Sequence, residues 1–285
     1  MSHAPEALRV ITADNPSPLT GPGTNTFLLG EAGIAVIDPG PDIASHQAAI
    51  LQAGDGRITH ILITHAHLDH SAGAAALSAA TGAPVLAFGD ADAGRSPLMQ
   101  SLVDTAGGGE GRDTAFRPDQ LLRDGDLIEG ADWSLTAIHT PGHMGNHLSF
   151  MWNDQLFCGD VILGWSSTLI SPPDGDLLDY FRSLDRIEAL CPARLLPAHG
   201  DPVEAPLPRI TALRAHRQDR TAQILAALRD GPANAADLAR RIYDVPPALL
   251  PAAARNVLAH LIALTQLGVA GAPAKMTSES EFSLR

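Results

Sequence analysis

Four metal-binding side chains fall within six consecutive residues, directly after the apolar run Ile61–Ile63. In chain order they are His65, His67, Asp69 and His70. Imidazole and carboxylate together form the donor set of zinc, iron and manganese sites in proteins. Alternate side chains of an extended loop point the same way. We therefore expect His65 and His67 to share one ion, with Asp69 and His70 turned toward a second position beside it. A purely structural role is disfavoured, because burying clustered His and Asp without partners is costly.

Three further donors repeat one local pattern much later in the chain. They are His143, Asp160 and His199, and each follows a short apolar, strand-like run and has a glycine next to it. Loops at one edge of a rigid sheet commonly present functional side chains in this way. The pattern predicts that the three donors complete a two-metal site with the first four.

In this order the seven donors resemble the ligand pattern of the metallo-β-lactamase-fold hydrolases, over about residues 8–204. The resemblance implies a four-layer αββα sandwich of the α/β class, whereas the residue pattern alone indicates only a mixed α and β domain. Position 67 is His rather than Glu, which separates the chain from the flavodiiron branch. The implied assignment gives metal one to His65, His67 and His143, metal two to Asp69, His70 and His199, and the bridging role to Asp160.

Short apolar runs punctuated by Gly, Pro, Asn and Asp predict the supporting elements. Asp42 is a candidate N-cap for the first helix, and Asn153-Asp154 marks a hairpin turn. Residues 91–115 include Gly107–Gly109 and are interpreted as a mobile insertion beside the site. The predicted strands are residues 8–12, 25–30, 33–38, 57–64, 84–88, 133–139 and 147–158, and the predicted helices are 42–54, 71–80 and 176–190.

The composition changes after His199, where residues 202–208 hold three prolines and are interpreted as a linker. A long helix is expected at 209–229, then helices at 234–243 and 248–267 and a β-like stretch at 269–285. We divide the chain into a catalytic domain 1–204, a linker helix 205–230 and a winged-helix-like domain 231–285. The last domain is similar to the appendage of the lactamase-β-like subgroup. One animal member of that subgroup is an endoribonuclease acting on single-stranded RNA.

Nucleic-acid reading by the C-terminal domain is not the favoured interpretation. Its 55 residues carry five Lys or Arg against four Asp or Glu, and the second helix offers only Arg255 and His260. Groove-reading helices cluster basic side chains to match phosphates. We expect instead a role in packing, in walling the substrate site or in dimerisation. A better candidate for anion binding is the basic face of the preceding helix, formed by Arg209, Arg214, His216, Arg217 and Arg220. The leading interpretation of this face is nevertheless a solvated surface whose basic side chains pair with acidic neighbours.

Charge and composition fit an intracellular enzyme. The net charge of −13, with one lysine among 19 basic residues, disfavours binding nucleic acid through a general basic field. Two divalent ions would still supply positive charge to a phosphate. Cys158 and Cys191 provide no disulfide framework, so we expect a reducing cytoplasm. No signal peptide and no apolar run long enough to span a bilayer are recognised, so no membrane partner is expected.

His147 is the additional candidate catalytic residue, four positions after His143. It is interpreted either as a substrate-facing general acid or as a histidine whose hydrogen bonds are satisfied behind the ligands. Related subgroup sequences often have an acid where Asn146 stands, so an acid–histidine relay is in doubt. The other histidines are expected at the surface, in the core or behind the ligands: His3, His46, His60, His139, His216 and His260.

The donor set predicts a hydrolase. Two divalent ions, zinc by preference and iron or manganese as alternatives, would activate a shared water and stabilise negative charge on a carbonyl or phosphoryl oxygen. Asp69 would both ligate and orient the nucleophile. The bond cleaved stays open among ester, thioester and phosphodiester, in a small-molecule or single-stranded nucleic-acid substrate, and a homodimer is a further expectation. Two alternatives are a mononuclear iron enzyme resembling persulfide dioxygenases and a non-catalytic metal-binding regulator.

Overall fold

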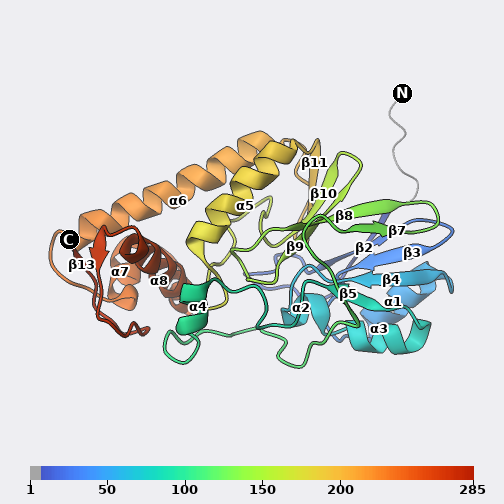
Figure 1. Cartoon of the computed structure of the whole chain (residues 1–285), viewed down its shortest axis with the longest axis horizontal. Coiled ribbons are helices and arrows are strands. Elements are labelled where there is room, and N and C mark those ends of the chain that lie inside the picture. The colour runs from blue at the N-terminus through green and yellow to red at the C-terminus, as the bar shows by residue number, and fades with distance from the viewer. Residues whose placement is uncertain (1–7) are drawn as a thin grey trace.

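Two β-sheets face each other in the right-hand half of Figure 1. The structure is a computed structural model that describes residues 8–285. The first sheet has the strand order β1-β2-β3-β4-β5-β6 and the second has the order β11-β10-β9-β8-β7. The strands of the first sheet are β1 Leu8–Thr12, β2 Asn25–Leu29, β3 Ile34–Ile37, β4 Ile58–Leu62, β5 Val85–Ala87 and β6 Gln120–Leu121. Those of the second are β7 Leu127–Glu129, β8 Ser134–His139, β9 Leu148–Trp152, β10 Gln155–Gly159 and β11 Arg194–Pro197.

Alternating apolar side chains fill the space between the sheets. Phe27 and Leu29 of β2 point into the shared core, whereas Leu28 between them packs in the cluster on the outer face. This is the two-residue period of a strand. Phe157 of β10 enters the same core from the other sheet and meets the ring of Phe27 edge-on, with 5.0 Å between centroids. The two sheets are therefore joined by one apolar layer.

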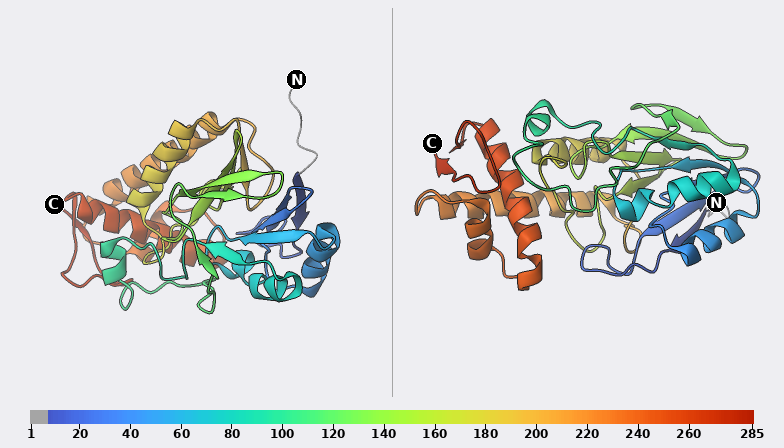
Figure 2. Two further views of the ribbon diagram at one scale, coloured as in Figure 1. Left: turned by 45° about the vertical axis from the view of Figure 1, so that its right-hand side comes forward. Right: turned by 90° about the horizontal axis from the view of Figure 1, so that it is seen from below.

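Helices cover the outer face of each sheet. Ile50 of α1 (Ala44–Gly54) and Leu77 of α3 (Ala74–Thr81) pack on the first sheet. Leu184 of α5 (Leu177–Leu190) and Ile210 of α6 (Pro206–Leu228) pack on the second. The predicted four-layer αββα arrangement is thus confirmed (Figure 2). The α6 helix begins three residues earlier than the sequence indicated, because proline is tolerated in the first turn of a helix.

Side-chain caps define some helix starts but not the one predicted at Asp42. Asp176 accepts hydrogen bonds from the N–H groups of Leu178 and Asp179 at the start of α5. The N-cap position of α1 is occupied by Ile43, without a side-chain cap. The prediction for Asp42 was wrong because the chain stays extended for one residue longer before it turns into the helix.

The C-terminal domain is built from two helices and a small β-ribbon. Helix α7 (Ala235–Ile242) and helix α8 (Leu250–Gln266), which follows the short 3₁₀ helix η1 (Pro247–Leu249), pack closely on each other. The predicted β-like stretch at 269–285 contains only the two-residue strands β12 (Ala270–Gly271) and β13 (Ser283–Leu284). The long helix α6 runs from the sandwich to this domain (Figures 1 and 2).

One segment of the C-terminal domain corrects an expectation drawn from hydropathy. Residues Pro247–Gln266 form a stretch that is long and apolar enough to cross a membrane by length and composition, and half of it is buried inside this structure. Val257 and Leu261 of α8 are fully buried in the core of the C-terminal domain. The apolar length is therefore used for packing in this fold.

Residues 91–115 are anchored rather than free. They contain the short helix α4 (Pro97–Ser101), and Met99, Leu102 and Ala106 are buried in the same apolar core as α8. The guanidinium of Arg255 in α8 donates hydrogen bonds to the carbonyl oxygens of Ala106, at 2.6 Å, and Gly107, at 3.2 Å. The interpretation of a mobile insertion was wrong, because it did not foresee that the C-terminal domain would cover this segment.

Candidate metal centre

The first four donors lie where β4 gives way to the one-turn helix α2 (Leu68–Ser71). His67, the last residue before α2, is extended, and His65 Nε2 lies 2.9 Å from His67 Nδ1, so the two side chains meet. Asp69 and His70 follow within the first turn of α2. The change from extended to helical backbone turns the second pair toward a neighbouring position, as the sequence pattern predicted.

His143 joins the first pair from the loop after β8. Its Nε2 lies 3.0 Å from His67 Nδ1, so three imidazole nitrogens meet at one point. Each nitrogen of a neutral imidazole either carries one hydrogen or offers one lone pair. Three such nitrogens that meet at one point therefore cannot all be satisfied by hydrogen bonds to one another. A cation at their meeting point would accept all three lone pairs.

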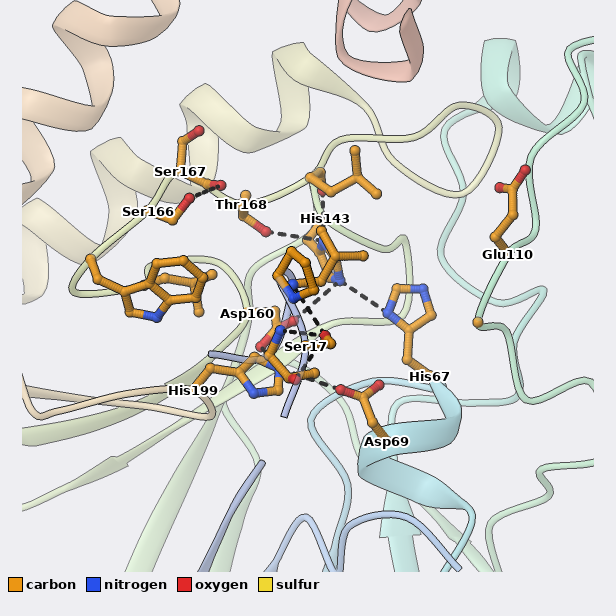
Figure 3. Close-up of a pocket in the computed structure, with 17 residues that line it drawn as sticks. Ser17, His67, Asp69, Glu110, His143, Asp160, Ser166, Ser167, Thr168 and His199 are labelled. Atoms are coloured by element: carbon orange, nitrogen blue, oxygen red, sulfur yellow. Dashed lines mark hydrogen bonds and ion pairs between the residues drawn. The ribbon is translucent and has the colours of Figure 1, made fainter. Parts of the chain in front are cut away.

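A second cluster lies beside the first. His70 Nε2 and His199 Nε2 are each 3.4 Å from Asp69 Oδ2. Asp160 lies between the clusters, with Oδ2 3.7 Å from both His70 Nε2 and His143 Nε2 and with Oδ1 3.3 Å from His199 Nε2. Each of its two oxygens therefore reaches the second cluster, and one also reaches the first (Figure 3).

Two buried atoms in these clusters fit a bound cation directly. Within residues 8–285, His70 Nε2 and Asp160 Oδ1 are buried and have no hydrogen-bond partner. Buried polar atoms are nearly always paired, because an unpaired one costs free energy. Both orphaned atoms point into the space where the donors converge, and imidazole and carboxylate are suitable ligands for zinc, iron or manganese. The residues present therefore fit a metal site.

The electrostatics divide the donors into neutral and charged groups. Burial, followed by the neighbouring histidines, holds the pKa of His65 well below its ordinary value and lowers that of His67 to about 3. Burial opposes charge on His199 as well, but the Asp160 carboxylate outweighs it and raises the pKa of His199 to about 10. Burial would raise the pKa of Asp160, yet His199 and His70 keep it well below its ordinary value. The first cluster therefore offers neutral imidazoles beside an ionised carboxylate. His199 of the second cluster carries a proton that a bound cation would displace, because a ligating imidazole must be neutral.

The far ring nitrogens of four histidines are held by hydrogen-bonding partners, which orients the rings. His143 Nδ1 donates to the carbonyl oxygen of Leu169 at 2.7 Å, and Thr168 Oγ1 lies 3.1 Å from the same nitrogen. His199 Nδ1 donates to the carbonyl oxygen of Gly23 at 3.1 Å. The other two contacts join His65 Nδ1 to Thr64 Oγ1, at 3.0 Å, and His70 Nδ1 to Asp38 Oδ2, also at 3.0 Å.

Asp38 is a site residue that the sequence reasoning missed. It is buried, and its carboxylate accepts hydrogen bonds from His70 Nδ1 and from both the N–H and the hydroxyl of Thr64. Its φ of +51° is unusual for a residue other than glycine. A signal was available, since Asp38 ends a strand and precedes Pro39-Gly40, much as the later donors end strands beside Gly or Pro. Asp38 therefore orients one ligand candidate and the loop that carries another.

The structure does not place His147 at the substrate side. Its side chain is fully buried, its Nδ1 lies 3.0 Å from Thr140 Oγ1, and its Nε2 accepts the backbone N–H of Asp160 at 3.1 Å. Burial, with His143 next, holds its pKa well below its ordinary value, so it stays neutral. These contacts match the second interpretation, a histidine whose hydrogen bonds are satisfied behind the ligands, because both ring nitrogens are used to position Asp160 and Thr140.

The other histidines fall mainly into structural roles. His46 is buried with Nε2 2.8 Å from Thr26 Oγ1, and His260 is buried with Nδ1 2.9 Å from Thr221 Oγ1. His139 Nε2 donates to the carbonyl oxygen of Gly145 at 2.8 Å. His3 lies outside the residues that the structure describes.

The arginines of α6 and α8 fix the loop 163–171 that walls the site, and they do not form an open anion-binding face. Arg209 donates to the carbonyl oxygens of Leu163, at 2.8 Å, and Ser166. Arg217 is fully buried and donates to the carbonyl oxygen of Thr168 and, at 3.0 Å, to Asn256 Oδ1. The same amide oxygen accepts the backbone N–H of Ile170, and Arg255 donates to Ser171 Oγ at 2.9 Å.

Two further arginines of α6 are also engaged. Arg214 pairs with Asp185 and Glu188 of α5, and Arg220 lies over the ring of Tyr243 at 4.0 Å. The pairing of Arg214 matches the expectation of a face paired with acidic neighbours. The four guanidinium groups of this face already bind carbonyl oxygens, carboxylates or an aromatic ring, so the structure does not favour the anion-binding alternative.

A cavity of 210 Å³ opens over the donors. His67, Asp69, His143, Asp160 and His199 line its floor, whereas His65 and His70 lie fully buried beneath it. Figure 3 shows Glu110 beyond His67, on the side of the cavity away from His199. The other lining residues are Ser17, Pro18, Leu19, Thr20, Gly111, Leu163, Trp165, Ser166, Ser167, Thr168 and Leu169.

Comparison with known proteins agrees with this geometry. Residues 19–199 match the profile of the metallo-beta-lactamase superfamily. Residues 235–272 match the profile of the beta-lactamase associated winged helix domain. Six of the seven donors lie inside the first match as internal positions, and His199 is its last residue.

Two similar sequences and one solved structure extend the comparison. A beta-lactamase-like protein 2 homolog of Drosophila melanogaster is 34% identical over 89% of this chain and 86% of the relative. An atrochrysone carboxyl ACP thioesterase of Cryptosporiopsis sp. is 26% identical over 79% of this chain and 63% of the relative. A crystal structure of a metallo-beta-lactamase family protein from Thermus thermophilus superposes with a TM-score of 0.79 at 25% identity, covering 98% of this chain and 99% of that one.

Proposed function

The chain belongs to the metallo-β-lactamase superfamily, and we propose that it is a dinuclear metal-dependent hydrolase that cleaves an acyl thioester or a closely related ester. The observation that carries the proposal is the convergence of seven donors on two adjoining positions at the floor of one cavity. A thioesterase among its relatives agrees with this choice of bond.

The geometry supports a division of the donors between two ions. His65, His67 and His143 would hold one ion, Asp69, His70 and His199 would hold the other, and Asp160 would bridge them. His65 is also within reach of His70 and Asp160, so the two positions adjoin. When bound, such a pair of divalent ions supplies an activated water and polarises a carbonyl oxygen. Zinc is our first expectation, and iron or manganese suits the same donors.

Asp69 is the ligand candidate best placed to handle a proton. Its carboxylate is partly exposed to the cavity, and it accepts a hydrogen bond from Thr24 Oγ1 at 3.4 Å. The His70 and His199 imidazoles, against the opposing effect of burial, keep its pKa below the ordinary value. An ionised carboxylate at this position can orient a nucleophilic water and accept its proton.

The lining of the cavity favours a neutral acyl substrate over a polyanion. Among residues 8–285, no lysine or arginine lines the cavity, whereas Asp69, Glu110 and Asp160 do. Proteins that hold nucleic acid neutralise phosphates with basic side chains, and the arginines of α6 near this site are already used by the fold. An uncharged acyl group needs no basic side chains for its binding. RNA cleavage is therefore the second candidate, favoured only by the subgroup resemblance.

The decisive experiment combines metal analysis with substrate assays. Purified protein reconstituted with Zn²⁺ should approach two equivalents per chain and should hydrolyse neutral acyl thioesters at a rate that responds little to salt. Asp160→Asn should lose metal and at least ~100-fold in turnover, because one carboxylate serves both ions. Asp154→Asn, on the exposed hairpin turn, is the matched control. One equivalent of metal, or cleavage of RNA at low salt without thioester hydrolysis, would contradict the proposal.

A further inference from the structure

Trp165 stands between the metal cavity and a second, outer groove. Within the described chain it is the one residue that lines both the 210 Å³ cavity and a 620 Å³ groove bounded by residues 200–205. We infer that Trp165 is the specificity-determining residue of this enzyme, closing the acyl end of the cavity so that compact apolar acyl groups are selected. The inference rests on the proposed thioester hydrolysis and names the part of the substrate that the cavity holds.

Trp165 is exposed, yet it is firmly placed. Its side chain is 48% exposed, whereas Trp133 and Trp152 are each only 6% exposed. The indole packs against Gly21 and Gly200, where an added Cβ would lie 3.3 Å from Trp165 Cζ2 and 2.8 Å from Trp165 Cδ1. Both glycines have positive φ, at +60° and +77°, which other residues rarely adopt. Two glycine loops thus hold the indole against the chain.

The apolar end of the cavity is on the His199 side. Gly200, which contacts the indole, directly follows His199, and Leu163 precedes Trp165 by two residues in the same loop. Pro18 and Leu19, in the loop before β2, also line the cavity, and Gly21 of the same loop contacts the indole. The opposite end carries the exposed carboxylate of Glu110 (Figure 3). The cavity therefore has an apolar end and an acidic end, with the metal donors between them.

This polarity assigns the two halves of the substrate. An apolar acyl group would be desolvated favourably against Trp165, Leu19 and Leu163. The thiol half would extend toward Glu110, where a carboxylate accepts hydrogen bonds from amide N–H groups and repels anions. Hydrolysis adds the elements of water across the C–S bond, giving a carboxylic acid at the apolar end and a thiol at the acidic end. The inferred substrate is therefore a neutral amide-bearing thioester with an apolar acyl group.

The size of the cavity limits the acyl group. An apolar cavity of about 150 Å³ holds one benzene molecule, and the present cavity measures 210 Å³. One ring, or a chain of about six carbons, would come close to filling the whole cavity, so it is the upper limit for the acyl group. A longer chain would collide with the indole, because the outer groove begins on the other side of Trp165. Removing the indole would join the cavity to that groove.

The test compares N-acetylcysteamine thioesters with acyl chains of two to twelve carbons. In the wild type, kcat/KM should rise about fourfold for each methylene buried, up to about six carbons, and should then fall. Trp165→Ala should move the optimum to longer chains and raise the decanoyl-to-hexanoyl ratio of kcat/KM at least ~10-fold. Trp165→Phe should give an intermediate optimum. Leu127→Ala, at an exposed apolar side chain on the edge strand β7, should change nothing.

A binding measurement supplies a readout that does not depend on turnover. Trp165 is the half-exposed tryptophan, so an inert S-hexyl thioether of N-acetylcysteamine should shift its fluorescence, and the shift should vanish in Trp165→Phe. Thioester turnover with an unchanged chain-length optimum in a folded, metal-loaded Trp165→Ala would overturn the role of Trp165 and leave the hydrolase standing. Absence of thioester turnover in metal-loaded wild type would instead overturn the proposed function, and this inference with it.

Discussion

Replacing Arg217 by methionine separates the stability of the fold from the affinity of the metal centre. The guanidinium is fully buried, and within the described residues it has no carboxylate within ion-pair distance. It instead donates to the Thr168 carbonyl oxygen and to Asn256 Oδ1. Thr168 and Leu169 hold the far nitrogen of His143, so Arg217 reaches a ligand candidate through one loop.

The opposing contributions to unfolding free energy nearly cancel. Arg217→Met removes two charge-assisted hydrogen bonds worth ~1.5–3 kcal/mol each. It also removes the cost of burying a guanidinium without a counter-charge, which is several kcal/mol, and burial lowers the pKa of Arg217 accordingly. We expect the free energy of unfolding of the metal-free protein to change by less than about 2 kcal/mol.

Metal affinity should respond much more strongly. Loss of a residue that orients a ligand typically weakens metal binding about 10- to 100-fold, and the loop holding His143 would lose its contact to Arg217 while keeping those to Arg209. The assay is competition for Co²⁺ or Zn²⁺ with a chromophoric chelator, combined with denaturant unfolding of the metal-free protein. Asn256→Ala should weaken the metal similarly, because its amide holds both Arg217 and Ile170.

Arg214→Met is the matched control, three residues earlier on the same helix and paired only with carboxylates of α5. It should leave metal affinity unchanged. Wild-type metal affinity in Arg217→Met would refute the reasoning. So would a large loss of stability in the metal-free protein, above about 4 kcal/mol, with no separate effect on the metal.

Two further predictions concern buried groups outside the cavity. Asp38→Asn should weaken metal binding about 10- to 100-fold. An amide has a single accepting oxygen, so it cannot accept all three hydrogen bonds that the two Asp38 oxygens receive from the Thr64 N–H, the Thr64 hydroxyl and His70 Nδ1. Asp55→Asn, at an exposed turn, should leave metal binding unchanged, and chelator competition measures both variants. Burial, followed by Arg217, His216 and Arg220 of α6, lowers the pKa of His260 to about 3. The stabilising effect of a neutral, buried His260 is therefore complete above pH 6.5 and is lost as pH falls toward 3. Denaturant unfolding of metal-free protein between pH 7.5 and 5 should show His260→Gln losing less stability than wild type, by up to about 1.4 kcal/mol per pH unit; identical slopes would exclude a neutral buried His260.

The donors around β4 and α2 could be predicted from the sequence because their geometry is local. A short loop that ends in the extended residue His67 and runs into a helical turn places His65, His67, Asp69 and His70 close together through local backbone conformation. Asp160 and His199 were also predictable as strand-end residues beside glycine. The sandwich itself was implied by resemblance rather than by periodicity, because buried strands and buried helix segments have similar apolar patterns.

Tertiary structure alone decided which groups surround those donors. His147 looked free in sequence, but its hydrogen bonds to Asp160 and Thr140 exist only after β8, β9 and β10 pair. The basic residues of α6 suggested an anion site until folding brought the loop 163–171 against them. Trp165 is held between the cavity and the outer groove by its contacts with Gly200 and Gly21, which lie more than 30 and more than 140 positions away in the chain. Such contacts depend on chain segments that meet only when the layers pack, and no local spacing rule encodes them.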